Sequence, residues 1–491
     1  MVISCFQWRA VVSRGRMAGA GLLVLGLAGC AQFPSLDALA AFKPASDYQT
    51  NASFSAPQVA WPEDGWWRTY GDKQLDGLIE EALRDSPDMA AAVARLGRAE
   101  AAGQVAGAPL LPQVSANASA TQQRQSYNYL MPKSATPQGW NDYGRATLDL
   151  SWELDFWGKN RAALAAATSE VEARRAEVAQ ARLLLAANVA SAYAELARLY
   201  AARDTAARSV EVRAKTATLF AERFTNGLET RGSVRDAEAR RATAEGDLLS
   251  MEEQIGLQRN CLAALLGAGP DRGLSIARPA VQLDARPGLP GNLPVELIGR
   301  RPDIVAARLQ AEAQLRRIDQ KKAEFYPNIN LTAFIGLQSL GLDMLNKSGS
   351  TVGSIGPAIS LPIFTGGRLR GELRGSVATY EEAVANYNRT VSLALQEVAD
   401  AGLSQRTLGG RLAKAEEATS AAAEAHRVAR NRYEGGLSSY LEVLSAEDVL
   451  LNSLRSLSDL QSRAFTLDVA LIRALGGGYR EAAVSATESS T

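Results

Sequence analysis

Few side chains in this 491-residue sequence have the types and spacing that covalent or acid–base chemistry requires. The single histidine, His426, lies in the helical-looking stretch AEAHRVAR, and no zinc-protease or Ser-His-Asp signature surrounds it. The glycine-rich GSTVGSIG (349–356) lacks the lysine of a phosphate-binding loop, and GGRLRG (366–371) is only part of a dinucleotide fingerprint. We therefore predict that the protein is not an enzyme and uses no metal and no cofactor.

Cys30 is the one position at which we expect a covalent modification. Basic residues at positions 9, 14 and 16 precede the apolar run MAGAGLLVLGL (17–27), which is too short to span a bilayer and is typical of a secretory signal. This run ends in Leu-Ala-Gly-Cys30, which resembles the bacterial lipobox, so we expect residues 1–29 to be removed and Cys30 to carry a lipid in the outer membrane. An ordinary signal peptide with an incidental cysteine is the alternative.

The stretch TLDLSWELDF (147–156) alternates between two faces. Such alternation predicts a β-strand, here with one apolar and one acidic face. Its length is sufficient for a tilted strand that crosses a membrane. The acidic face carries Asp149, Glu153 and Asp155.

The sequence is a tandem duplication of a unit of about 210 residues. LPQVSANA (111–118) matches YPNINLTA (326–333), and RFTNGLETRGSVRDAE (223–238) matches RYEGGLSSYLEVLSAE (432–447) in the same order. We expect an N-terminal lipidated extended segment over 30–71, a first repeat over 72–270, a linker over 271–292, a second repeat over 293–476 and a tail over 477–491.

Each repeat is predicted to contain a first helix, two strands, a long helix and a return helix. We place the first helices at 73–105 and 293–324, the long helices at 159–226 and 368–434, and the return helices at 232–266 and 437–475. The first long stretch contains neither proline nor glycine, and Asn226-Gly227 and Gly435-Gly436 end the two long helices as C-caps do.

The strands are predicted to open at Pro112 and Pro327 and to return over 147–156 and 352–364. Lipid does not tolerate open sheet edges, and four strands are too few to close a barrel. If these strands cross a membrane, several chains must therefore join. A soluble sheet at the end of a helical rod is the alternative, because it would show the same alternation.

This order of elements resembles the TolC/OprM outer-membrane efflux family. GRRPDIVAARLQAEAQ (299–314), FYPNINLTAFIG (325–336), SLPIFTGGR (360–368) and SWELDFWGKNR (151–161) are similar to its motifs, and the lipobox suggests its NodT-like lipoprotein branch. The resemblance implies a mixed α and β membrane protein. Three chains with four strands each would close a 12-stranded β-barrel in the outer membrane, continuous with a long α-helical barrel in the periplasm.

The resemblance also implies a function and partners. The homotrimer would be the passive exit duct of a tripartite efflux pump, carrying drugs or other small toxic compounds from a periplasmic adaptor and an inner-membrane RND-type transporter. A type I protein-secretion duct and a rod-like structural lipoprotein without a pore are the alternatives. No nucleic-acid partner is expected, because 53 basic side chains balance 53 acidic ones.

The family further implies roles for particular residues. Glu442 would contribute to an acidic ring at the pore aperture, with Ser445 at the second acidic position, and a solvated helix charge is the alternative for Glu442. Tyr433 would belong to a closing latch, in which a hydrogen bond to Ser233 is the weaker possibility. Asp149, Glu153 and Asp155 would line the barrel lumen and favour cationic or zwitterionic passengers. The helical hairpin tips would dock the adaptor or pump through Arg223, Gly227, Leu228, Arg432, Gly436 and Leu437.

Overall fold

The computed structural model describes residues 38–128, 131–281 and 288–481, so the predicted signal sequence and Cys30 lie outside the described residues. The chain divides into two compact units. Of the described residues, one unit contains 38–41, 97–128, 131–172 and 308–385, and the other contains 42–96, 173–281, 288–307 and 386–481. Among the residues that the structure describes, no helix combines the length and the apolar character that crossing a bilayer requires.

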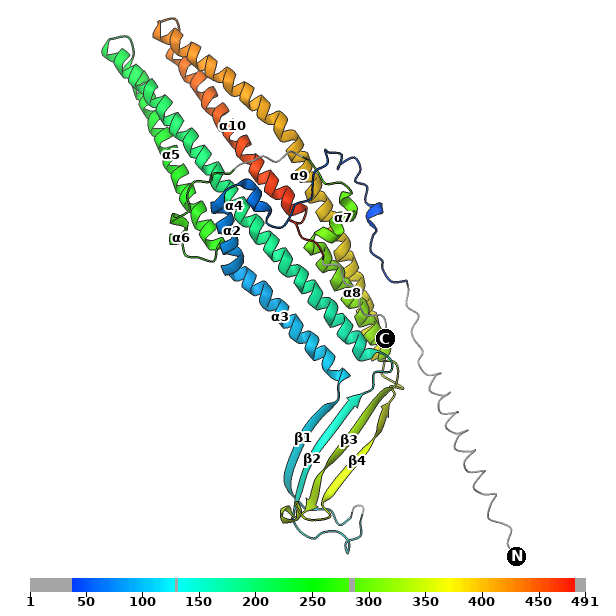
Figure 1. Cartoon of the computed structure of the whole chain (residues 1–491). Helices are drawn as coiled ribbons and strands as arrows, with labels where there is room; N and C mark the ends of the chain where they lie inside the picture. The colour runs from blue at the N-terminus through cyan, green and yellow to red at the C-terminus, as the bar shows by residue number, and fades with distance from the viewer. Residues whose placement is uncertain (1–37, 129–130, 282–287, 482–491) are drawn as a thin grey trace, which may run out of the picture. The chain divides into compact units, whose positions relative to one another are not determined.

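The two halves of the chain repeat the same series of elements, which confirms the duplication (Figure 1). The long helices α4 and α9 have 67 residues each, and the return helices α5 and α10 have 35 each. The first half contains α2 (Lys73–Asp85), α3 (Pro87–Gly107), β1 (Gln113–Gln123), β2 (Asn141–Glu153), α4 (Lys159–Thr225) and α5 (Arg231–Leu265). After the short helix α6 (Asp271–Leu274), the second half contains α7 (Leu293–Arg300), α8 (Pro302–Ala323), β3 (Asn328–Leu340), β4 (Thr351–Ser360), α9 (Arg368–Glu434) and α10 (Tyr440–Ala474).

The prediction of one continuous first helix in each repeat is wrong. The chain leaves the helical conformation at Ser86 (φ −66°, ψ 131°) and at Arg301 (φ −107°, ψ 117°). Each of these residues precedes a proline, and the proline ring disfavours helical backbone in the residue before it. A short helix is therefore followed by a separate longer one in both halves.

The ends of two other elements also differ from the prediction. Helix α10 begins at Tyr440 rather than at 437, because Ser439 is extended (φ −79°, ψ 157°). Strand β4 ends at Ser360 rather than at 364, and Pro362 follows it closely. Proline has no N–H to donate to a strand ladder, so it is favoured outside the paired region.

The four strands form one antiparallel sheet in the order β1-β2-β3-β4. The register pairs Ala116 with Leu148, Leu148 with Ile335, and Ile335 with Gly353, so apolar side chains of the inner strands share one face. This face is open, since the exposed fraction is 55% for Leu148 and 77% for Ile355. Within the described residues, β1 and β4 each have a single neighbouring strand.

Gly336 of β3 lies close against the backbone of β2. A Cβ at this position would come within 2.1 Å of the Ala146 carbonyl oxygen and 2.7 Å of the Thr147 Cα. We expect Gly336→Ala to destabilise the sheet by about 3 kcal/mol or more, because the backbone of β2 must move to make room for the added methyl group. Folded protein of this kind is expected to resist SDS and to change its mobility in a gel only after heating. The fraction of the variant that shows such a heat-modifiable band should fall.

Gly356→Ala is the matched control, because Gly356 lies on the same face of the sheet and a Cβ there would meet no atom within 4 Å. Equal loss of the heat-modifiable band in both variants would contradict this explanation.

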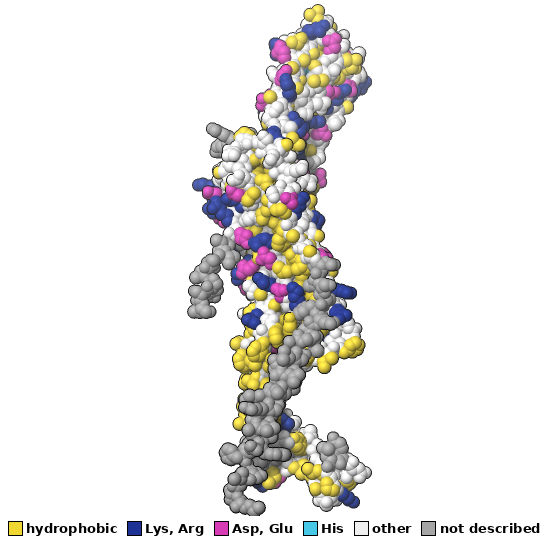
Figure 2. Space-filling view, turned by 90° about the vertical axis from the view of Figure 1, so that its right-hand side faces the viewer, with side chains coloured by type: hydrophobic (Ala, Val, Ile, Leu, Met, Phe, Trp, Pro, Cys, Tyr) yellow, Lys and Arg dark blue, Asp and Glu magenta, His cyan; other side chains and the backbone are white. Residues whose placement is uncertain are grey.

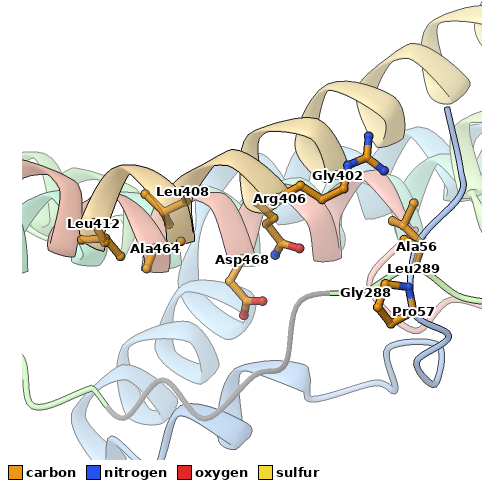
Figure 3. Close-up of a pocket in the computed structure, with 12 residues that line it drawn as sticks. Ala56, Pro57, Gly288, Leu289, Gly402, Arg406, Leu408, Leu412, Ala464 and Asp468 are labelled. Carbon is orange, nitrogen blue, oxygen red and sulfur yellow. The ribbon is translucent and has the colours of Figure 1, made fainter. Parts of the chain in front are cut away.

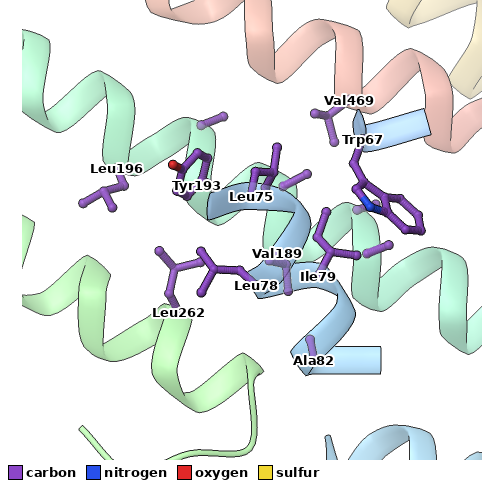
Figure 4. Packing of buried hydrophobic residues seen from close by; sticks show 14 of the residues in the cluster. Trp67, Leu75, Leu78, Ile79, Ala82, Val189, Tyr193, Leu196, Leu262 and Val469 are labelled. Atoms are coloured by element: carbon purple, nitrogen blue, oxygen red, sulfur yellow. The ribbon is translucent and has the colours of Figure 1, made fainter. Parts of the chain in front are cut away.

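The largest buried cluster packs the segment before α2 against four helices (Figure 4). Trp67 precedes α2, Leu75 belongs to α2, Tyr193 to α4, Leu262 to α5 and Val469 to α10. The Tyr193 hydroxyl also donates a 2.7 Å hydrogen bond to the carboxylate of Asp72, which caps α2 by accepting from the Gln74 N–H. The α4/α5 hairpin and α10 thus share one core.

Candidate functional site

Two tight turns join the long helices to their return helices, and each contains a glycine in the left-handed conformation. Gly227 has φ +74° and Gly436 has φ +71°. The Leu228 N–H donates to the Arg223 carbonyl oxygen at 2.8 Å, and the Leu437 N–H donates to that of Arg432 at 2.8 Å. Both turns therefore close in the same way, as the glycine C-caps predicted from the sequence require.

Tyr433 connects the two hairpins close to these turns. Its side chain is 3% exposed, and its hydroxyl donates a 2.5 Å hydrogen bond to Glu229 Oε2 in the other turn. The guanidinium of Arg223 lies 4.5 Å from the centre of the Tyr433 ring and also donates to the Tyr433 carbonyl oxygen at 3.3 Å. The two hairpins of one chain are thus linked by the buried Tyr433, which contacts the charged side chains of Glu229 and Arg223.

The direct hydrogen bond between Ser233 and Tyr433 that the sequence suggested is absent from the described residues, because Glu229 lies between them. The Ser233 hydroxyl donates to Glu229 Oε1 at 2.8 Å, while Tyr433 binds the other carboxylate oxygen. The role of Glu229 was not predicted from the sequence. The internal duplication contained the signal, since the second repeat has Ser438 at the corresponding position and the acidic residue occurs in one turn only.

The hydrogen bonds around Glu229 determine its charge. Burial raises the pKa of Glu229, but hydrogen bonds from Tyr433, from the Thr230 N–H and from Ser233 outweigh that effect and lower the pKa below its ordinary value. Burial and the hydrogen bond to this carboxylate raise the pKa of Tyr433. At neutral pH the contact therefore joins a neutral phenol to an ionised carboxylate, which is a charge-assisted hydrogen bond.

Glu442 and Ser445 lie on the first turns of α10, and both are exposed in the chain. Glu442 Oε2 is 3.7 Å from Arg432 Nη1, so its charge is partly compensated by the tip arginine. Leu228 and Leu437, each next to the glycine of its turn, have exposed fractions of 64% and 74%. Figure 2 shows hydrophobic and charged side chains intermixed at this upper end of the molecule.

A cluster of charged side chains that was not predicted from the sequence lies between the α4/α5 hairpin and α10. Glu447 is 1% exposed and accepts a 2.8 Å hydrogen bond from the Thr216 hydroxyl. Arg213 lies 3.5 Å from Glu447 and 3.2 Å from Asp448, and Arg240 lies 3.1 Å from Asp448. Burial raises the pKa of Glu447, while the Thr216 hydrogen bond and Arg213 oppose that rise.

The three acidic residues predicted for the barrel lumen lie in different surroundings. Asp149 Oδ2 accepts from Asn117 Nδ2 at 2.9 Å and from the Thr147 hydroxyl at 2.7 Å on the polar face of the sheet. Glu153, the last residue of β2, pairs with Lys159 at 2.5 Å. The prediction for Asp155 is wrong, because the strand ends before it. Its carboxylate accepts from the N–H groups of residues 160 and 161 and caps the start of α4.

None of these residues lines the cavity of about 470 Å³ shown in Figure 3. Leu408 of α9, Ala464 of α10 and Leu289 contribute apolar walls. The one carboxyl group there, Asp468, already accepts a 2.7 Å hydrogen bond from Tyr70, and burial raises its pKa. Among the described residues, no group of three or more His, Cys, Asp and Glu side chains is arranged to hold a metal ion.

Comparison with known proteins identifies relatives of the same architecture. The chain matches the family described as outer membrane efflux protein over residues 78–268 and 293–477. It is 39% identical to the fusaric acid resistance protein FusA of Burkholderia cepacia, covering 74% of this chain and 69% of FusA. It is 33% identical to the multidrug resistance outer membrane protein MdtP of Escherichia coli K12, covering 86% of this chain and 87% of MdtP.

Solved structures give the same result. The outer membrane protein VceC of Vibrio cholerae is similar with a TM-score of 0.81 and 50% identity, over 85% of this chain and all of that one. The MtrE outer membrane channel of Neisseria gonorrhoeae is similar with a TM-score of 0.75 and 27% identity, over 91% of this chain and 98% of that one. The chain therefore belongs to the outer membrane efflux protein family, and it is an outer-membrane exit duct for efflux and not an enzyme.

Proposed function

We propose that three copies of this chain assemble into one closed duct in the outer membrane. The observation that carries this proposal is the four-stranded sheet, in which β1 and β4 each have one neighbouring strand among the described residues and the apolar face is exposed. Backbone groups at an open edge cannot be satisfied by lipid, so the β1 edge of one copy pairs with the β4 edge of the next. Three such sheets give twelve strands, which exceeds the smallest closed barrels.

The hairpin tips are the proposed docking surface for a periplasmic adaptor and an inner-membrane RND-type transporter. Exposed leucines beside arginines give this surface an apolar centre with a basic rim, which suits a protein partner. The tip comprises Arg223, Gly227, Leu228, Arg432, Gly436 and Leu437. Arg223 also holds Tyr433, so a partner that binds Arg223 would act directly on the link between the hairpins.

The same end of the helices is the proposed gate. Tyr433, Glu229 and Ser233 hold the two hairpins of each chain together in the resting state. Three copies of Glu442 around a narrow aperture would repel one another and retain cations, while Ser445 adds no second charge. Asp149 and Glu153 face the proposed lumen, and the charge of Glu153 is compensated because it is paired with Lys159.

The proposed passengers are drugs and other small toxic compounds. The relatives FusA and MdtP are named for resistance to fusaric acid and to multiple drugs, which supports this assignment over protein secretion. Deletion of the gene should lower the minimal inhibitory concentration of at least one toxic compound about fourfold or more, and the intact gene should restore it. Unchanged tolerance to every compound together with loss of a secreted protein would favour the type I secretion duct instead.

The proposed anchor is a lipid on Cys30, which precedes the described residues. The lipid would add to the hold that the exposed apolar face of the sheet has on the membrane. Incorporation of labelled palmitate into the intact chain but not into Cys30→Ser tests this proposal. Equal labelling of both proteins would place the lipid elsewhere.

A further inference from the structure

An aromatic side chain of β3, Phe334, lies on the polar face of the sheet, which also carries Tyr143 of β2. Phe334 of β3 is directly opposite Asp149 of β2 and Ser354 of β4. Residues that alternate with it along β3 and those paired with them are mostly polar, among them Asn330, Thr332, Ser151 and Gln338. A phenylalanine at this place is not required by the apolar face, which is formed by the other set of alternating residues.

Arg145 of β2 lies over the Phe334 ring, with its guanidinium carbon 5.0 Å from the ring centre. Its cross-strand partner is Gln338, so the side chain leans along the strands to reach the aromatic ring. Within the described part of the chain, the Arg145 guanidinium forms no hydrogen bond or ion pair. Its N–H groups are therefore available to donate two parallel hydrogen bonds to a planar anion such as a carboxylate, which is the bidentate contact that guanidinium favours.

Asp149 completes the cluster from the same face. Both of its hydrogen bonds, from Asn117 and from Thr147, end on Oδ2, and no partner of Oδ1 is found among the described residues. Thr147 is only 6% exposed, so the side chain that orients the carboxylate is itself held in place. Asp149 therefore presents one fixed, open acceptor oxygen beside an arginine with open donors.

We propose that Arg145, Phe334 and Asp149 form a binding site for small aromatic molecules that carry both a carboxylate and an amine. The carboxylate binds the Arg145 fork, the amine donates to Asp149 Oδ1, and the aromatic ring packs against the Arg145–Phe334 pair. Neighbouring residues on paired strands lie about 5 to 8 Å apart, which matches the dimensions of an amino-acid-sized molecule. The site rests on the proposed duct, because this face lines the lumen only when the sheets close.

Four small probes separate the three contacts. Phenylalanine has the ring and both charges, 2-phenylethylamine lacks the carboxylate, 3-phenylpropionate lacks the amine, and leucine lacks the ring. We expect saturation-transfer NMR on the purified protein in detergent to give phenylalanine a dissociation constant about fivefold lower than those of the other three. Each of Arg145→Gln, Asp149→Asn and Phe334→Leu should weaken phenylalanine binding about threefold to fivefold, which is the typical effect of losing one exposed ionic contact or one aromatic contact.

Phe334→Tyr, which keeps the ring, should retain binding. Ile335→Leu, whose side chain lies on the opposite face, is the control for a general effect on the sheet. Each variant is used only after its heat-modifiable band shows that it has folded. Equal affinity for phenylalanine and leucine, or unchanged phenylalanine binding in all three site variants, would overturn the inference.

Conductance of the same samples in planar bilayers separates this inference from the proposed function. Conducting protein with no preference for phenylalanine would disprove the site and leave the duct intact. Protein that selects phenylalanine but neither conducts nor supports tolerance to toxic compounds would disprove the duct.

Discussion

Tyr433→Phe is expected to open the periplasmic end of the duct. The substitution keeps the aromatic packing against Phe220 but removes the hydrogen bond to Glu229. A hydrogen bond to a charged group contributes about 1.5–3 kcal/mol, and three chains would each lose one. Even with incomplete additivity, we expect the open population to rise about a hundredfold. Single-channel recordings in planar bilayers should show a several-fold larger mean conductance.

Tyr440→Phe is the matched control for this prediction. Tyr440 packs against the same Phe220 at 5.7 Å between ring centres, and its hydroxyl has no hydrogen-bond partner among the described residues. Removing this hydroxyl should leave the conductance unchanged. Glu229→Gln, which keeps the shape of the acceptor without its charge, should give an intermediate conductance. If both tyrosine variants behave like the parent protein, the Tyr433–Glu229 contact does not hold the gate closed.

The long elements of this fold could be predicted from the sequence because their signals are local. Absence of proline and glycine over 159–225 predicts one helix, and glycine in each turn ends it. The breaks at Ser86 and Arg301 were missed although a proline follows each of them. In these repeats the alanine-rich helical pattern resumes after the proline, so periodicity alone suggested a single helix.

The residues at the candidate site were predicted less completely, because burial and pairing depend on distant segments. Asp155 continues the alternation of β2 without a fault, but it caps α4, and the pattern alone does not distinguish these two roles. Glu229 and Glu447 are ordinary acidic residues in the sequence. They become important only because Tyr433 and Arg213, more than 200 positions away in each case, contact them.

Arg213→Met is expected to destabilise the packing between the α4/α5 hairpin and α10 by about 3–5 kcal/mol. Arg213 is the basic residue nearest to Glu447, and removing one partner of a buried ion pair leaves the other charge uncompensated. Hydrogen exchange at the amides of 205–225 and 440–455 should become faster by at least about a hundredfold. Replacing both residues, as Arg213→Met with Glu447→Gln, should restore much of the protection, because no unpaired charge then remains.

The internal repeat supplies a control, and pH supplies an independent test. Glu238 occupies the position in the first repeat that corresponds to Glu447, and its partner Arg235 is exposed, so Arg235→Met should change hydrogen exchange little.

Because burial raises the pKa of Glu447 above its ordinary 4.5, the folded state binds the carboxyl proton of Glu447 more tightly than the unfolded state does. Its contribution to stability is therefore complete below about pH 4.5 and is lost as the pH rises through the raised pKa. Arg213→Met should extend this loss of stability to higher pH, and Glu447→Gln should abolish it. Identical pH profiles of stability in the parent protein and in both variants would show that Glu447 does not titrate in the folded chain.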